Sequence, residues 1–188
     1  MLSLILAAVF SLTACSEAGG SQEAAVVQEP AVTASSSGEA IESYTVTDVR
    51  GKEIAFDAVP ERVATVGKPF PSLYYAIEGA TDHIVGCNPS SIKAYNESVL
   101  RYMYPQLENA VTDWCNTDST VNIEELLKLR PDVVFIYSTD DQEIEKIEDA
   151  GIKVVALRSA ELDSVKENLQ IIAAVCQKEE RGKQLIQY

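Results

Sequence analysis

The residues best suited to bind a ligand occupy a short loop after the first apolar strand pattern. The loop covers residues 67–72, with the letters GKPFPS, and a helix pattern begins at Ser72. A helix start leaves free backbone N–H groups that favour anions. Lys68 adds a positive charge and Phe70 a flat apolar face, so the loop could hold a carboxylate-bearing ligand or a small oxyanion. Its two prolines donate no N–H, which weakens the case for an anion, and a rigid surface turn is the alternative.

Other candidate residues stand at or just after the ends of apolar strand patterns: Asn88, Ser90, Tyr137 and Arg158. The carboxyl ends of parallel strands meet at one edge of a sheet, and ligands bind beyond that edge. Arg158 is the most telling of the four, because a guanidinium can bind an anion through two hydrogen bonds. A solvated residue at the end of a strand is the alternative for Arg158.

Aromatic residues suggest a wall of the same cleft. Trp114 lies in a polar, irregular stretch (111–121), and Tyr95, Tyr102 and Tyr104 are nearby in sequence. Aromatic rings stack on flat ligands, and tyrosine and tryptophan keep a polar tip. We therefore expect Trp114 to face the cleft, whereas packing beneath a loop is favoured for Tyr102 and Tyr104.

The cysteines and the single histidine do not form a reactive site. Cys87, Cys115 and Cys176 remain after Cys15, and an odd number cannot all pair within one chain. A Cys87–Cys115 disulfide is one option in an exported protein, and Cys176 lies in an apolar helix pattern typical of a buried thiol. His83 begins the strand pattern that Cys87 ends, so the two lie at opposite edges of the sheet. With no zinc-site spacing and no glycine-rich nucleotide motif, a metal-ion receptor and an enzyme are both disfavoured.

Alternating strand and helix patterns predict an α/β fold. Four apolar strand patterns alternate with helix patterns, which is typical of a parallel, Rossmann-like sheet with helices on both faces. The strands are expected at residues 62–66, 83–87, 132–137 and 153–157, and the helices at 72–78, 91–104, 122–129, 141–150 and 161–178. Before them, residues 44–49 and 53–57 alternate around a glycine-containing turn and predict a β-hairpin.

The N-terminal segment predicts export and a lipid anchor. Residues 2–14 form an uncharged apolar run, too short to span a bilayer and typical of a signal peptide (1–14). The run ends in Leu12-Thr13-Ala14-Cys15, which resembles the lipobox in which the cysteine is lipidated. No Lys or Arg precedes the run, so the signal is atypical or the true start lies upstream, and an unmodified Cys15 is the alternative. Residues 15–40 follow as a flexible linker without aromatic residues.

The net charge restricts the partners. The formal charge is −14, and 46% of the residues are hydrophobic. The apolar content is that of a globular domain, and the stretch from residue 41 onward is long enough for one core. The negative charge argues against nucleic acid and against contact with an anionic membrane through a basic patch.

Five short motifs occur in register between residues 44 and 188: Thr47-Asp48-x-x-Gly51, Pro60-x-Arg62-Val63, Glu78-Gly79-Ala80-x-x-x-Ile84-Val85-Gly86, Asn122-Ile123-Glu124-Glu125 followed by Arg130-Pro131-Asp132-Val133-Val134, and Ala150-Gly151-Ile152-x-Val154-Val155. Together they resemble the substrate-binding proteins of ABC importers for iron–siderophores, haem and cobalamin. Some members of that group bind oxyanions such as molybdate.

The resemblance implies two α/β lobes joined by one long helix, with the ligand between them. Residues 41–178 are then the N-terminal lobe, residues 179–188 start the interlobe helix, and the second lobe is missing. A fragment of this kind has half of a binding site, so its affinity should be weak or absent. The resemblance also implies that Glu124 docks onto arginines of the membrane permease. Helix capping is an alternative that can hold together with docking, since Asn122 suits the N-cap and Glu125 the third helical position.

The sequence therefore predicts the extracytoplasmic, lipid-anchored solute-binding component of an ABC importer. The expected ligand is an iron–siderophore or a related metal chelate, with cobalamin, haem or a small oxyanion such as molybdate as alternatives. The expected partners are the permease subunits and, through the lipid on Cys15, the membrane. Neither catalysis nor a resident cofactor is expected. A lipoprotein that only contacts other proteins is the alternative from another class.

Overall fold

The computed structural model describes residues 43–159 and 161–187. The predicted signal peptide (1–14), Cys15 and the linker (15–40) lie outside the described residues and stay predictions. The strands are β1 (Tyr44–Thr47), β2 (Glu53–Phe56), β3 (Val63–Thr65), β4 (Ile84–Cys87), β5 (Val133–Tyr137) and β6 (Lys153–Leu157). The helices are α1 (Phe70–Glu78), α2 (Pro89–Asn96), α3 (Leu100–Met103), the 3-10 helix η1 (Pro105–Asn109), α4 (Ile123–Leu129), α5 (Asp141–Asp149), α6 (Leu162–Val175) and α7 (Glu179–Ile186).

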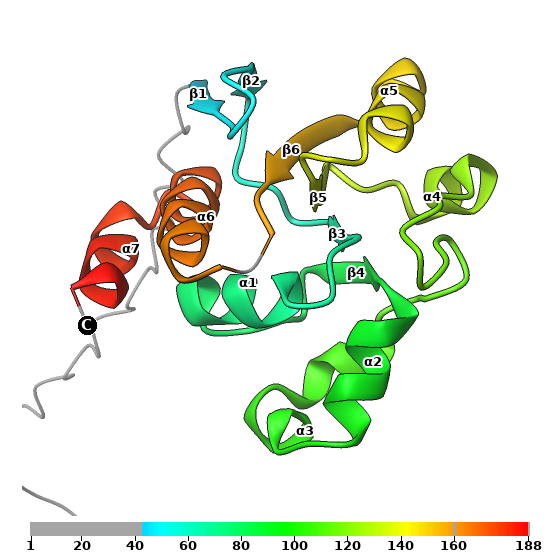
Figure 1. Ribbon diagram of the computed structural model, residues 1–188, viewed down its shortest axis with the longest axis horizontal. Helices are drawn as coiled ribbons and strands as arrows, with labels where there is room; N and C mark the ends of the chain where they lie inside the picture. Colours follow the sequence, from blue (N-terminus) through cyan, green and yellow to red (C-terminus); the bar gives the residue numbers. More distant parts are fainter. Residues whose placement is uncertain (1–42, 160, 188) are drawn as a thin grey trace, which may run out of the picture. The chain divides into compact units, whose positions relative to one another are not determined.

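Four parallel strands form the central sheet in the order β4-β3-β5-β6, which confirms the predicted α/β fold. Successive side chains of a strand point to opposite faces. In β5, Val133 and Phe135 therefore pack with α1 and α6, while Val134 and Ile136 pack with α4 and α5 (Figure 1). Apolar residues on both faces are what a parallel sheet between two helical layers requires.

The predicted single helix over residues 91–104 is wrong, because the segment forms two helices. α2 ends at Asn96, and α3 begins at Leu100. Between them, the Ser98 hydroxyl accepts a hydrogen bond from the Leu100 N–H at 3.3 Å. Serine competes in this way with regular helix bonding, so it favours a new helix start over continuation.

The helix predicted over residues 161–178 is present as α6, and α7 begins at Glu179, where a separate helix was expected. Between them, Gln177 takes a left-handed conformation with φ 54°. α7 then turns back against α6 and α1. A Cβ on Gly182 would lie 2.7 Å from the Ala173 Cβ, so glycine permits this close approach.

Asp48 joins the N-terminal hairpin to the central sheet. β1 and β2 pair in antiparallel register as predicted, and Gly51 supplies the turn with φ 79°. The fully buried Asp48 carboxylate accepts hydrogen bonds from the backbone N–H groups of Arg50 at 2.9 Å and of Ala156 in β6 at 3.0 Å. The Arg50 guanidinium lies 2.7 Å from the same carboxylate, and the Val49 N–H donates to the Ala156 carbonyl at 3.4 Å.

The other outer strand, β4, also has a backbone partner outside the sheet. The Val111 N–H donates to the Val85 carbonyl at 3.0 Å, and the Cys87 N–H donates to the Val111 carbonyl at 3.0 Å. Val111 belongs to the stretch that was predicted to be irregular. Its two hydrogen bonds cover part of the outer edge of β4, although residue 111 is not in a strand.

Replacing Asp48 with Asn should lower the free energy of unfolding by about 3 kcal/mol, because charge-assisted bonds to a buried carboxylate are lost. Equilibrium urea unfolding followed by circular dichroism measures the change. Asp57→Asn is the matched control. The Asp57 side chain is 91% exposed and its ion pair with Lys153 is long, at 3.7 Å, so the substitution should hardly change the free energy of unfolding. Equal stability of the two variants would contradict the structural role of Asp48.

Candidate functional site

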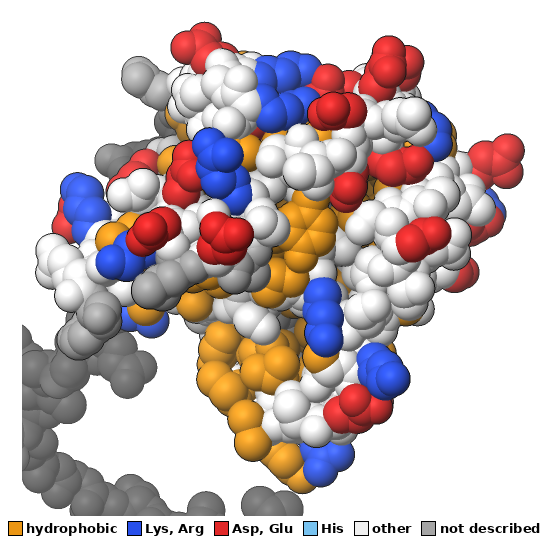
Figure 2. All heavy atoms as spheres, viewed as in Figure 1, with side chains coloured by type: hydrophobic (Ala, Val, Ile, Leu, Met, Phe, Trp, Pro, Cys, Tyr) orange, Lys and Arg blue, Asp and Glu red, His pale blue; other side chains and the backbone are white. Residues whose placement is uncertain are grey.

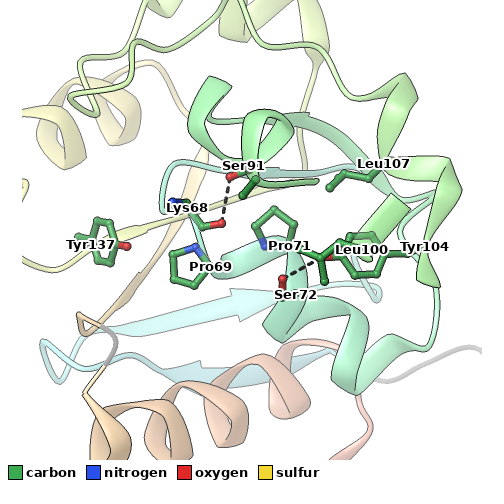
Figure 3. Close-up of a pocket in the computed structure, with 10 residues that line it drawn as sticks. Lys68, Pro69, Pro71, Ser72, Ser91, Leu100, Tyr104, Leu107 and Tyr137 are labelled. Atoms are coloured by element: carbon green, nitrogen blue, oxygen red, sulfur yellow. Dashed lines mark hydrogen bonds between the residues drawn. The ribbon is translucent and has the colours of Figure 1, made fainter. Parts of the chain in front are cut away.

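A cavity of about 380 Å³ opens at the carboxyl edge of the sheet (Figure 3). We call it the carboxyl-edge pocket. It is lined by the loop after β3, by the last residue of β5 and by the helices near them: Lys68, Pro69, Pro71, Ser72, Ser91, Ala94, Leu100, Tyr104, Leu107 and Tyr137. Ligands of proteins with an open α/β sheet bind at this edge.

Three of the predicted site residues, Lys68, Ser72 and Tyr137, line this pocket. Lys68 is exposed and is the one charged residue among the described residues that line it. The Ser72 hydroxyl lies 2.8 Å from the phenol oxygen of Tyr104, which joins α1 to the chain between α3 and η1. Burial raises the pKa of the Tyr137 phenol, and the nearby Asp140 carboxylate raises it further. Tyr137 is therefore a neutral hydroxyl at physiological pH.

The prediction that Phe70 offers its face to a ligand is wrong. Its side chain is completely buried beneath Gly67 and packs on Tyr137 with ring centroids 4.8 Å apart. A Cβ on Gly67 would lie 2.4 Å from the Phe70 ring, so the glycine allows the backbone to pass directly over the ring. Phe70 thus supports the pocket wall from behind.

The prediction that Trp114 faces the cleft is also wrong. Its side chain is completely buried in the core on the α4 and α5 side of the sheet, and its indole N–H donates to the Val111 carbonyl at 3.1 Å. The ring packs so closely on Gly86 that an added Cβ there would meet the indole nitrogen at 2.6 Å. Trp114 is therefore a core residue, and its polar group is satisfied internally.

Asn88 and Ser90 have structural roles at the start of α2. The Asn88 side chain accepts a hydrogen bond from the Ser90 N–H at 2.8 Å and donates one to the Asn116 carbonyl at 2.9 Å. The Ser91 N–H in turn donates to the Asn88 carbonyl at 2.8 Å. Asn88 thus caps α2 and fixes the following loop, and neither Asn88 nor Ser90 lines the carboxyl-edge pocket.

Arg158 directly follows β6 but does not line the pocket. Its guanidinium lies 2.6 Å from the Glu167 carboxylate of α6, and both side chains are about half exposed. Its backbone N–H donates to the buried Asn168 side chain at 2.9 Å. Arg158 therefore attaches the end of β6 to α6, and its guanidinium already has an anionic partner.

The helix starts beside the pocket offer few free donors. At α1, the Phe70 N–H donates to the Gly67 carbonyl and the Ser72 N–H to the Pro69 carbonyl, both at 3.1 Å. Pro71 has no N–H, and at α2 the first available N–H groups bind Asn88. Both helix starts thus satisfy their own donors, so a bare anion would depend on Lys68 and the hydroxyl groups.

The sequence did not single out Leu100 and Leu107, and it favoured packing beneath a loop for Tyr104. These residues form the apolar wall of the pocket together with its prolines. Tyr104 is almost fully buried, as packing beneath a loop requires, and yet its hydroxyl reaches Ser72. The wall residues Leu100, Tyr104 and Leu107 all follow the break between α2 and α3, which the pattern missed.

Glu124 is exposed in the first turn of α4. The Asn122 side chain caps this helix as predicted, accepting hydrogen bonds from the N–H groups of Glu124 at 3.1 Å and Glu125 at 3.3 Å. A reciprocal capping box is not formed, because the Glu125 carboxylate lies 2.6 Å from Lys128 instead.

The Val121 N–H, just before α4, donates to Glu143 in the first turn of α5, which follows the carboxyl end of β5. The Leu129 carbonyl at the other end of α4 accepts from Arg62, just before β3. Glu124 therefore stands at the same edge of the sheet as the pocket.

The three described cysteines are free and buried, as expected for Cys176. Burial raises the pKa of the Cys87, Cys115 and Cys176 thiols to about 12. Such thiols are not ionised at physiological pH and are poor nucleophiles. Within residues 43–159 and 161–187, no group of three or more His, Cys, Asp or Glu side chains is arranged to hold a metal ion. In the same part of the chain, no helix has the length and apolar character needed to cross a membrane.

The family model of the periplasmic binding proteins matches residues 65–188. The chain therefore belongs to the periplasmic binding protein family, whose members are solute-binding proteins. This match agrees with the resemblance drawn from the five motifs.

Individual relatives agree in fold. The chain is 33% identical over 128 residues to the molybdate-binding protein MolA of Haemophilus influenzae, covering 57% of this chain and 36% of the relative. A periplasmic solute-binding protein of Veillonella parvula is 31% identical with a TM-score of 0.74, covering 78% of this chain and 44% of that one. The TroA-like protein FepB from Veillonella parvula is 25% identical with a TM-score of 0.62, covering 76% and 45%. The chain thus spans less than half the length of these relatives.

Proposed function

We propose that this chain supplies a ligand-binding lobe to the extracytoplasmic solute-binding component of an ABC importer. The observation that carries the proposal is the carboxyl-edge pocket, which lies where open α/β sheets bind ligands and has one cation and no carboxylate in its described lining. Binding without catalysis is favoured, because the thiols are buried and un-ionised.

The pocket favours a metal chelate, such as an iron–siderophore, over a bare oxyanion. Its wall is largely proline, leucine and tyrosine surface, which suits the organic body of a chelate. The helix starts have few N–H groups left for a tetrahedral anion. Lys68 would then face an anionic group of the chelate.

Molybdate is the second candidate, because the relative that is 33% identical to this chain is a molybdate-binding protein. Haem and cobalamin are further candidates within the same class. All of these would occupy the same edge of the sheet, so one set of variants tests them together.

Replacing Lys68 with Ala should weaken binding of a ferric citrate–hydroxamate chelate about tenfold, because a charged contact to the anionic group is lost. Equilibrium dialysis with radioactive iron measures the affinity for the chelate, and molybdate is added as the competing ligand. Lys93→Ala is the matched control, an exposed lysine on α2 that does not line the pocket. If the Lys68→Ala and Lys93→Ala variants bound the chelate equally well, the assignment of Lys68 to the site would be contradicted.

Glu124 is the proposed contact to the permease. Its exposed carboxylate at the pocket edge is placed to meet a cation of a partner that approaches this edge. In the complete transport system, Glu124→Lys should abolish uptake while ligand affinity stays unchanged. The control is Glu145→Lys on α5, which is also exposed. Uptake that survives the Glu124 reversal would exclude this docking role.

The anchor on Cys15 is the remaining part of the proposal. It rests on the apolar run before Cys15 and the polar linker after it. Replacing Cys15 with Ser should move the protein from the membrane fraction to the soluble extracytoplasmic fraction and abolish labelling by radioactive palmitate. Ser16→Ala is the control and should keep both. Palmitate labelling of the Cys15→Ser variant would show that the lipid is attached elsewhere or not through this motif.

A further inference from the structure

The first strand, β1, begins at the amino edge of the central sheet, where the parallel strands start. The Tyr44 phenol donates to the carbonyl of Val175, the last residue of α6, at 2.6 Å. Because α6 follows β6, it runs back from the carboxyl edge and ends at the amino edge. Tyr44 also stacks on Phe56, whose ring lies 5.2 Å from the Nζ atom of Lys153, the first residue of β6. The chain before β1 therefore joins the domain at the amino edge.

The hairpin that contains β1 is firmly attached to the rest of the domain. Asp48 binds it to β6, and its turn carries Arg50 and Lys52, whose side chains lie 3.1 Å and 2.5 Å from the Glu148 carboxylate of α5. Figure 2 shows charged side chains of both signs side by side over the hairpin and α5. These contacts fix the place at which the chain before Tyr44 joins the domain.

The carboxyl-edge pocket and Glu124 lie at the opposite edge of the sheet. With its 14 residues, α6 alone covers about 21 Å between the two edges. In Figure 1, β1 lies at the top of the view, whereas α3, which supplies Leu100 to the pocket lining, lies at the bottom. A partner that contacts Glu124 therefore meets the side of the domain that faces away from the start of β1.

We propose that residues 16–43, which we call the strap, must exceed a minimum length for the anchored protein to dock on its permease. This inference rests on the proposed function, because it requires the anchor on Cys15 and docking through Glu124. A short strap would keep the amino edge next to the membrane, so that Glu124 pointed away from the permease. Docking turns the carboxyl edge toward the membrane, and the strap must then pass along the side of the domain.

The strap is long enough for this path. It places 28 residues between Cys15 and Tyr44, and an extended chain of that length reaches at most about 100 Å. A flexible chain of the same length has an average end-to-end distance of about 30 Å, still longer than α6. The path along the domain thus lies within ordinary reach of the strap, and shortening the strap should have a sharp limit.

Deleting residues 18–41 leaves four residues between Cys15 and Tyr44, with a reach of at most about 18 Å, less than the length of α6. Proteoliposomes that hold the permease and the lipidated full-length protein are assayed for ATP-driven uptake of radioactive iron from a ferric citrate–hydroxamate chelate. This deletion should lower uptake at least tenfold and leave chelate affinity and palmitate labelling unchanged. Deleting residues 18–29 leaves a reach of about 60 Å and should keep uptake.

Two controls separate the length of the strap from its sequence and from folding. Replacing residues 18–41 with a Gly-Ser segment of equal length should keep uptake. Adding Cys15→Ser to the deletion of residues 18–41 releases the protein from the membrane. This released variant, supplied in solution, should support uptake again, because a free domain can turn its carboxyl edge to the permease.

Full uptake with the anchored deletion of residues 18–41 would overturn the inference while the proposed function stands. Loss of uptake in the Gly-Ser replacement would do the same, since sequence and not length would then be required. Loss of uptake in the released variant would also overturn it, because the defect would not depend on the anchor. If the unaltered protein drives no uptake, both the inference and the proposed function fail.

Discussion

Parallel alignment of β3 to β6 is the constraint on which the rest of the structure depends. Because all four strands run the same way, each connection must cross a face of the sheet, and helices cover both faces. The loops that leave the strands then meet at one edge. The carboxyl-edge pocket and the exposed carboxylate of Glu124 share that edge as a direct result of strand direction.

Most polar groups near that edge are used to hold the structure together. Asn88 caps α2, Arg158 pairs with Glu167, and the first N–H groups of α1 bind carbonyls of the preceding loop. The chemistry left for a ligand is therefore a single lysine, several hydroxyl groups and apolar surface. This balance is the reason that we propose an organic chelate, whose body supplies apolar contacts, ahead of an anion that needs many donors.

The strands, most helices and the parallel topology could be predicted from the sequence, because apolar periodicity reflects burial on both faces of the sheet. The site could be predicted only in part. Lys68 and Tyr137 reach the pocket since strand ends fix their position. Trp114 could not be placed, because a polar, irregular stretch does not reveal which way a large ring points. The apolar wall was missed for a related reason: a serine within a helix pattern does not tell where the chain will break.

The closure of both outer strands has a consequence for self-association. Free strand edges are templates on which another chain can add a strand, and this is a common route to aggregation. Here Val111 binds the Val85 carbonyl and the Cys87 N–H of β4, and Val49 and Asp48 bind the carbonyl and the N–H of Ala156 in β6. The hairpin therefore protects one edge of the sheet from pairing with another chain, and it also adds to the core.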